Sequence, residues 1–154
     1  MNAIMAGKKG LIMGLANDRS LAWGIAQKLA EHGAELAFSY QGEALERRVR
    51  PLAEQLGSSL LVDCDVSDMA ALDHTFAKLR ESWDSLDFVV HAIGFSDKNE
   101  LRGKFVDTSL DNFLLTMNIS VYSFVAVAQR AARMMRAGGS LLTLSYYGAE
   151  KVIP

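Results

Sequence analysis

The chain has 154 residues, of which 50% are hydrophobic, a formal net charge of -2 and one cysteine. This is enough for one buried core, and a weakly acidic chain without a long basic run is not expected to bind nucleic acid. One cysteine excludes an internal disulfide, and no Cys/His pair has zinc-ligand spacing. The short apolar run after Lys9 predicts neither a signal peptide nor a membrane span. We expect a soluble, metal-free protein of the reducing cytoplasm.

Short apolar runs alternate along the chain with longer segments of helical period. This alternation is typical of a parallel sheet that is covered on both faces by crossover helices. The runs predict five strands, at residues 10–14, 34–40, 59–63, 87–92 and 140–145.

Four helices are predicted between these strands. The first begins after Ser20, which serves as its N-cap, and ends at His32-Gly33, a typical helix C-terminus. The others are expected at residues 43–56, 68–83 and 110–135.

Right-handed crossovers predict a sheet with the first strand at its centre, the second and third strands on one side, and the fourth and fifth on the other. The fold class is therefore α/β, a Rossmann-type doubly wound parallel sheet. Five strands leave it incomplete, so residues 1–154 are expected to form a single dinucleotide-binding domain in the N-terminal part of a longer protein.

Ligands of such sheets bind outside the carboxyl ends of the strands, at the switch point between the first and fourth strands. The segments that follow the five strands should therefore face one crevice. They begin at Gly14, Tyr40, Asp63, Ala92 and Ser145.

The first strand runs into a turn with the spacing G-x5-S-x3-G. Gly14 allows the backbone to turn sharply, and Ser20 can cap the helix while its hydroxyl meets a pyrophosphate. Gly24 is expected to allow close packing of the helix on the sheet. A plain strand-turn-helix with a serine cap explains the same residues, so the motif alone leaves both interpretations open.

This spacing, followed by Ile25-Ala26, resembles the enoyl-acyl-carrier-protein reductases, a divergent branch of the short-chain dehydrogenase/reductase superfamily. The resemblance extends over essentially the whole chain. It implies that Gly14, Ser20 and Leu21 contact a nicotinamide dinucleotide.

Gln41 closes the second strand, where the resemblance implies a glutamine in place of the usual ribose-binding acid. A neutral glutamine gives a weaker preference for NADH over NADPH than a carboxylate does. Positions 40–42 hold no basic residue, which favours NADH. Arg47 and Arg48 follow soon after, so NADPH is not excluded, although a solvated helix face is the better explanation of these two residues.

Residues at the ends of the third and fourth strands also resemble parts of the family's coenzyme-binding site. Asp65 and Val66 resemble the family's adenine-binding turn. An aspartate at a strand end is also commonly the N-cap or turn former for the next helix, a role that Asp68 could share. Ile93 and Gly94 resemble the superfamily's cofactor-contacting strand end, where a glycine lets backbone approach the ribose closely.

The resemblance also implies substrate-binding residues. Phe95 and Ser96 would begin the wall beside the acyl group. Tyr146, after the fifth strand, corresponds to a substrate-contacting tyrosine near the thioester carbonyl and is the predicted catalytic residue. A second tyrosine and a lysine seven positions later, which the family uses for proton transfer and ribose binding, are expected beyond Pro154.

Other residues have competing interpretations. Tyr147 and Lys151 form the Y-x3-K pair of ordinary short-chain dehydrogenases, but Ser145 precedes Tyr147 too closely, and we interpret the pair as coincidental. His91 lies inside an apolar strand and should point away from the crevice. Asn118 fits either the water-holding asparagine of ordinary short-chain dehydrogenases or a helix-interior amide bonded to backbone.

The resemblance implies NADH-dependent reduction of the trans-2 double bond of an acyl chain on acyl carrier protein, in fatty-acid biosynthesis, by a homotetramer. Two alternatives remain open. One is an ordinary short-chain alcohol dehydrogenase that uses Tyr147 and Lys151, and the other is a non-catalytic dinucleotide-binding module.

Overall fold

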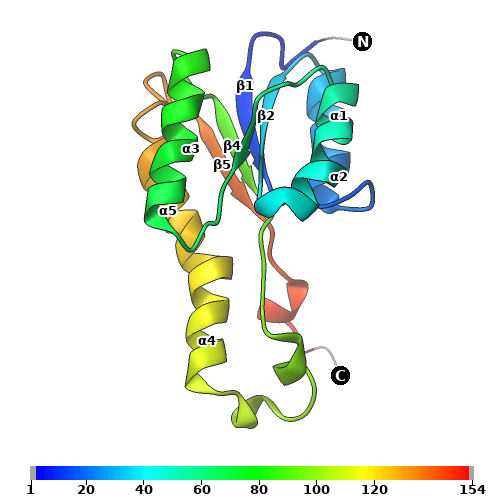
Figure 1. The fold of residues 1–154 in the computed structure, drawn as a ribbon, viewed down its shortest axis with the longest axis vertical. Coiled ribbons are helices and arrows are strands. Elements are labelled where there is room, and N and C mark those ends of the chain that lie inside the picture. The colour runs from blue at the N-terminus through cyan, green and yellow to red at the C-terminus, as the bar shows by residue number, and fades with distance from the viewer. Residues whose placement is uncertain (1–2, 153–154) are drawn as a thin grey trace.

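A computed structural model describes residues 3–152, which form a parallel sheet with helices on both faces (Figure 1). The five strands pair in the order β3-β2-β1-β4-β5, and every pairing is parallel. The strands are β1 (Lys9–Met13), β2 (Glu35–Tyr40), β3 (Leu61–Asp63), β4 (Phe88–His91) and β5 (Ser140–Thr143). The predicted Rossmann-type sheet and its strand order are confirmed.

The helices that cover the sheet lie in two layers. One layer holds α1 and α2, and the other holds α3 and α5, as Figure 1 shows. The helices are α1 (Leu21–Glu31), α2 (Gly42–Gln55), α3 (Met69–Ser82), α4 (Leu110–Met117) and α5 (Ser123–Ala131). The first three match the predicted helices to within a few residues.

Each face of the sheet carries its own apolar cluster. Successive residues of a strand point to opposite faces, so Leu11 and Met13 pack with residues of α3 and α5. Ile12 packs on the other face, with residues of α1 and α2. Because both faces are covered, all three side chains are fully buried, and the strand reads as a continuous apolar run.

The prediction of one uninterrupted helix over residues 110–135 is wrong in two respects. A π-helical turn, η3 (Asn118–Tyr122), separates α4 from α5. There the Ser123 hydroxyl donates to the Ile119 carbonyl at 2.6 Å and competes with the regular backbone ladder. The α-helix also ends at Ala131, because the amides of Arg133 and Met134 bond to carbonyls three residues back and tighten the last turn.

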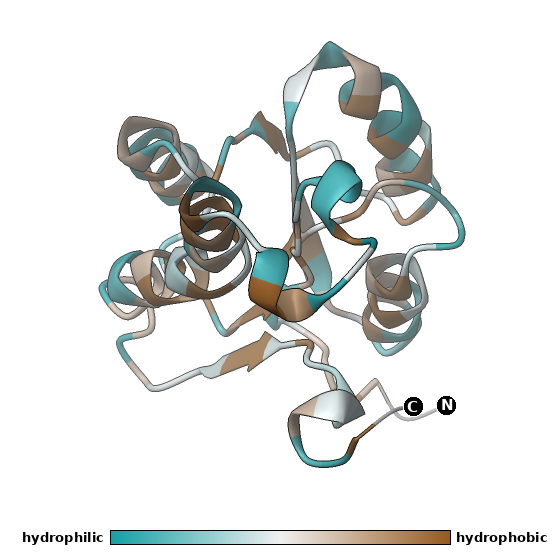
Figure 2. Ribbon diagram, turned by 90° about the horizontal axis from the view of Figure 1, so that it is seen from below, coloured by the Kyte–Doolittle hydropathy of each residue, from teal (hydrophilic) through white to brown (hydrophobic). Residues whose placement is uncertain are grey.

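The carboxyl ends of the strands all face the end of the molecule from which α4 extends (Figure 1). The loop between β4 and α4 contains two short 3₁₀ turns, η1 (Lys98–Glu100) and η2 (Phe105–Asp107), and a third, η4 (Tyr147–Ala149), follows β5. Figure 2 looks onto this end from below and shows apolar segments on the surrounding helices. The fold thus gathers the loops that follow the strands at one end of the sheet.

Candidate functional site

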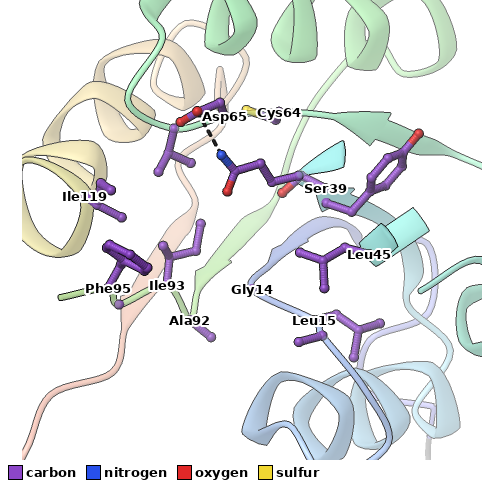
Figure 3. A pocket seen from close by; sticks show the side chains of 15 residues that line it. Gly14, Leu15, Ser39, Leu45, Cys64, Asp65, Ala92, Ile93, Phe95 and Ile119 are labelled. Atoms are coloured by element: carbon purple, nitrogen blue, oxygen red, sulfur yellow. Dashed lines mark hydrogen bonds between the residues drawn. The ribbon is translucent and has the colours of Figure 1, made fainter. Parts of the chain in front are cut away.

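A cavity of about 330 Å³ opens at the carboxyl ends of β1, β2, β3 and β4 (Figure 3). The predicted crevice is confirmed for these four strand ends. Ser145, which follows β5, is not among the lining residues. The lining consists of Gly14, Leu15, Ala16, Ser39, Tyr40, Gln41, Leu45, Cys64, Asp65, Val66, Ala92, Ile93, Gly94, Phe95 and Ile119.

Gly14 lies at the switch point between β1 and β4, where the backbone leaves the sheet. Its φ is +94°, and a Cβ on this residue would lie 2.0 Å from the carbonyl oxygen of Ala92. Only glycine fits, because any side chain would be strained and would collide with the backbone that leaves β4. The sharp turn predicted from the sequence is therefore confirmed, and it brings the backbone that leaves β1 against the backbone that leaves β4.

Ser20 and Leu21 lie outside the residues that line this cavity. The Ser20 hydroxyl accepts hydrogen bonds from the amides of Ala16 and Asn17, both at 3.1 Å, and makes no side-chain bond to the first turn of α1. Ser20 occupies the cap position, but its hydroxyl holds the preceding loop. Leu21 is 73% exposed. Contact of either residue with a pyrophosphate stays a prediction.

The expected packing role of Gly24 is wrong. Gly24 is exposed, and no atom outside its own helix turn lies within 4 Å of an ideal Cβ there. The buried face of α1 instead consists of Ala22, Trp23 and Ala26, so helical geometry turns position 24 toward solvent.

Gln41 and Asp65, from the ends of neighbouring strands, are joined across the cavity wall. The Gln41 side-chain nitrogen donates to Asp65 Oδ2 at 2.8 Å, which is the dashed line in Figure 3. Asp65 Oδ1 accepts from the amide and the hydroxyl of Ser67, at 2.9 and 2.6 Å. The hydrogen bond from the Ser67 hydroxyl holds the pKa of Asp65 below its ordinary value, against the opposing effect of burial.

Asp65 forms the turn before α3, because its Oδ1 accepts from the Ser67 amide two residues on, whereas Asp68 caps the helix. Asp68 Oδ1 accepts from the amide of Ala70, at 2.8 Å, in the first turn of α3. The Asp65 carboxylate accepts hydrogen bonds from Gln41 and Ser67 in the cavity wall, next to Val66.

Ile93, Gly94 and Phe95 line the cavity where the chain leaves β4. Sequence reasoning missed the residue that holds this segment. The Ser120 hydroxyl in η3 accepts from the Phe95 amide at 3.0 Å and lies 3.1 Å from the Phe95 carbonyl, to which it can donate. The two residues are 25 positions apart, so no local sequence pattern signals the contact.

Ser96 and Tyr146, two of the predicted substrate-binding residues, do not line the cavity. The Ser96 hydroxyl accepts from the Thr116 hydroxyl at 2.9 Å and lies within hydrogen-bond distance of the Asn112 amide group, so it faces α4. Tyr146 is 88% exposed. The tyrosine and lysine expected after Pro154 lie outside the described residues.

His91 is fully buried at the end of β4 and does not line the cavity, as its place in an apolar strand predicted. Burial lowers its pKa, so it is neutral near neutral pH. Cys64 does line the cavity, but burial raises the pKa of its thiol, which disfavours the reactive thiolate.

The Y-x3-K pair forms a single turn on the surface. The Lys151 amide donates to the Tyr147 carbonyl at 3.2 Å, and both residues are exposed and outside the cavity lining. Asn118 begins η3 with a half-buried side chain. Between Ala3 and Val152, no cluster of three or more His, Cys, Asp or Glu side chains is suited to hold a metal ion.

Comparisons with known proteins match this chain over nearly its whole length. A family model described as enoyl-(acyl carrier protein) reductase matches residues 14–154. The chain is 61% identical over 153 residues to enoyl-[acyl-carrier-protein] reductase [NADH] 1 of Rhizobium meliloti strain 1021, covering 99% of this chain and 56% of the relative.

Two solved structures superpose closely. The enoyl-acyl-carrier-protein reductase of Anaplasma phagocytophilum in complex with NAD is 59% identical with a TM-score of 0.96, covering 100% of this chain and 59% of that one. The Bacillus cereus enoyl-acyl carrier protein reductase with NADP⁺ and indole naphthyridinone is 45% identical with a TM-score of 0.95, covering 99% and 60%. The chain thus spans less than two thirds of the length of these relatives.

Proposed function

The chain belongs to the enoyl-(acyl carrier protein) reductase family, and from this we propose that the intact protein reduces the trans-2 double bond of acyl thioesters with NADH. Residues 1–154 would form its dinucleotide-binding domain. The observation that carries the proposal is the cavity at the switch point of the sheet, whose lining includes Gly14, Gln41, Asp65 and Gly94. In doubly wound sheets this position binds dinucleotides.

Several features of the cavity support the binding of a nicotinamide dinucleotide. Gly14 lets the backbone turn sharply beside Ala92 at the carboxyl end of β1, where a pyrophosphate would approach. Gln41 would bind the adenosine ribose, and the Asp65 carboxylate and Val66 amide would accept from and donate to the adenine. Ile93 and Gly94 would contact the nicotinamide half. Ser20 and Leu21 complete the proposed contacts, at the pyrophosphate.

When bound, NADH supplies a hydride for the β-carbon of the enoyl thioester. The residues of this chain would orient and shield that transfer. Phe95, which is 52% exposed beside the cavity, offers an apolar surface for the acyl chain. Ser96 would support this wall through its bonds to α4.

Tyr146 is the proposed catalytic residue of this chain. Its phenol would donate a hydrogen bond to the thioester oxygen and stabilise the negative charge that develops there as the hydride arrives. Its exposure leaves the phenol free to meet a substrate. Protonation of the α-carbon then completes the reduction.

Acyl carrier protein that bears an enoyl chain is the proposed partner, and the proposed assembly is a homotetramer in the cytoplasm. The run Leu110–Ala131 is long and apolar enough to span a membrane by length and composition, as core helices of soluble proteins also are. We assign its apolar face to contacts between subunits. The exposed side chains of that face are Leu110, Phe113, Leu114, Leu115, Met117, Val121, Tyr122 and Val125.

The proposal is tested by turnover of crotonyl-acyl-carrier protein with NADH by the intact protein, followed through NADH absorbance. We expect turnover, a reduced kcat in Tyr146→Phe, and little change in Tyr147→Phe. Reduction of a ketone that Tyr147→Phe abolishes would establish the alcohol dehydrogenase instead. Binding of NADH without turnover of the thioester would establish a non-catalytic module.

A further inference from the structure

The amide of Gln41 has one definite orientation, because its partner accepts hydrogen bonds only. Its nitrogen lies 2.8 Å from Asp65 Oδ2. An ionised carboxylate has no proton to donate, so the NH₂ group of the amide must face it. The Asp65 carboxylate is ionised near neutral pH, because the ordinary aspartate pKa of 3.8 lies far below 7 and the Ser67 hydrogen bond lowers the pKa of Asp65 further.

The opposite edge of the Gln41 amide is its carbonyl oxygen, which accepts hydrogen bonds only. The amide is planar, so fixing the nitrogen on Asp65 turns this oxygen away from the carboxylate. No hydrogen bond to this oxygen occurs within residues 3–152. Gln41 therefore turns its acceptor oxygen away from Asp65 and toward a ligand in the cavity, while one N–H of its amide is held by Asp65.

A second carboxylate lies beside the same turn. Asp63 Oδ1 accepts from the Gly42 amide at 2.8 Å, so the backbone donor that follows Gln41 is already used. Arg47 is paired with Glu43, with 3.5 Å between guanidinium nitrogen and carboxylate oxygen, and it does not line the cavity. Among the described residues that line the cavity, Asp65 is the only charged one, and Asp63 lies at the cavity rim beside the same turn.

This arrangement distinguishes the adenosine ribose of NADH, which has a 2′-hydroxyl, from that of NADPH, which has a 2′-phosphate. A ribose 2′-hydroxyl has a proton to donate to an acceptor. A 2′-phosphate near neutral pH carries a charge of about -1.5 to -2 and accepts only, so it would face the Gln41 oxygen and the Asp65 carboxylate. Related solved structures hold NAD in one case and NADP⁺ in another, so family membership alone does not settle the preference.

We infer that Asp65 is a specificity-determining residue that selects NADH over NADPH by fixing the Gln41 amide with its carbonyl oxygen toward the ribose. The inference rests on the proposed function for the presence of the coenzyme, and it goes beyond that function in assigning the selection to the pair. Asp65 acts here as a positioning residue, through Gln41.

Direct binding of the two reduced coenzymes to the intact protein tests the inference. The readout is the ratio of the NADPH to the NADH dissociation constant, measured by nicotinamide fluorescence. Asp65→Asn keeps the shape and an acceptor for Ser67, but its amide lets Gln41 turn its NH₂ group toward a phosphate. We expect this ratio to fall about tenfold, a change of about 1.4 kcal/mol. Loss of an adenine contact cancels in the ratio, because both coenzymes carry the same adenine.

Asp63→Asn is the matched control, because it removes one carboxylate from the same rim and retains an acceptor for the Gly42 amide. We expect it to change the ratio much less than Asp65→Asn does. The effect of Asp65→Asn should also disappear in a Gln41→Ala background, as a double-mutant cycle reveals.

Three results overturn the inference: equal effects of the two aspartate variants, an undiminished effect of Asp65→Asn in Gln41→Ala, or a wild-type protein that binds both coenzymes equally well. A wild-type protein that binds neither coenzyme refutes the proposed function itself. The two failures are therefore distinguishable.

Discussion

His91 in β4 and Ser123 in α5 lie 2.7 Å apart, between Nε2 and the hydroxyl oxygen, in the interior below the cavity. Ser123 uses its only hydroxyl proton on the Ile119 carbonyl, so His91 Nε2 must carry the proton that it donates to Ser123. His91 Nδ1 then accepts from the Thr143 hydroxyl, at 3.3 Å. One neutral imidazole thus connects β4, β5 and the first residue of α5.

The stability of the protein should decrease as the pH falls through the histidine range. Burial lowers the pKa of His91 from its ordinary value of 6.5. Unfolding exposes the ring, which takes up a proton below about pH 6.5. The contribution of neutral His91 is therefore fully present above that pH and is lost as the pH falls through the folded-state pKa.

Denaturant titrations of the intact protein between about pH 7 and pH 5 measure this loss. His91→Gln should flatten the pH dependence of the free energy of unfolding. His74→Gln, at an exposed position of α3, is the control and should leave the dependence in place. An unchanged slope in His91→Gln would refute the assignment.

Gly14→Ala should destabilise the protein by about 3 kcal/mol or more, because the new Cβ would combine backbone strain with a clash against the Ala92 carbonyl. Gly24→Ala, in the open face of α1, should instead stabilise the protein by about 0.5–1 kcal/mol, since alanine is the better helix former. Thermal or denaturant unfolding checks both values. Similar losses in the two variants would contradict the account of the turn.

Ser120→Ala should release the segment that leaves β4, because both backbone groups of Phe95 lose their partner. We expect a loss of about 1–2 kcal/mol in stability and a higher dissociation constant for NADH. Ser82→Ala, at the exposed end of α3, is a matched control and should change neither. If Ser120→Ala binds NADH as the wild type does, the hydroxyl does not hold the cavity wall in a binding-competent form.

The sheet was predictable because each of its strands is a short, continuous apolar run in the sequence. A buried parallel strand is apolar on both faces, and right-handed crossovers restrict the order of the strands. Helix ends were readable where they use local chemistry, as at Gly33, which has a φ of +92° beyond α1, and at Ser109, whose hydroxyl accepts from the Asn112 amide.

Contacts between distant segments were not predictable in the same way. Gln41 and Asp65 are 24 residues apart, and His91 and Ser123 are 32 apart. A side chain with two possible partners shows its choice only in three dimensions, as Ser20 does by bonding back to the loop before α1. The π-helical turn was not predictable either. The Ser123 hydroxyl that bonds to the Ile119 carbonyl in this turn is itself held by the distant His91.

The central claim is that the carboxyl ends of β1 to β4 hold a nicotinamide dinucleotide. Titration calorimetry of the intact protein with NADH tests this most directly. We predict a saturable heat corresponding to about one NADH per chain, with weaker binding in Gln41→Ala. An absence of heat with NADH, NAD⁺ and NADPH alike, from protein shown to be folded, would contradict the account.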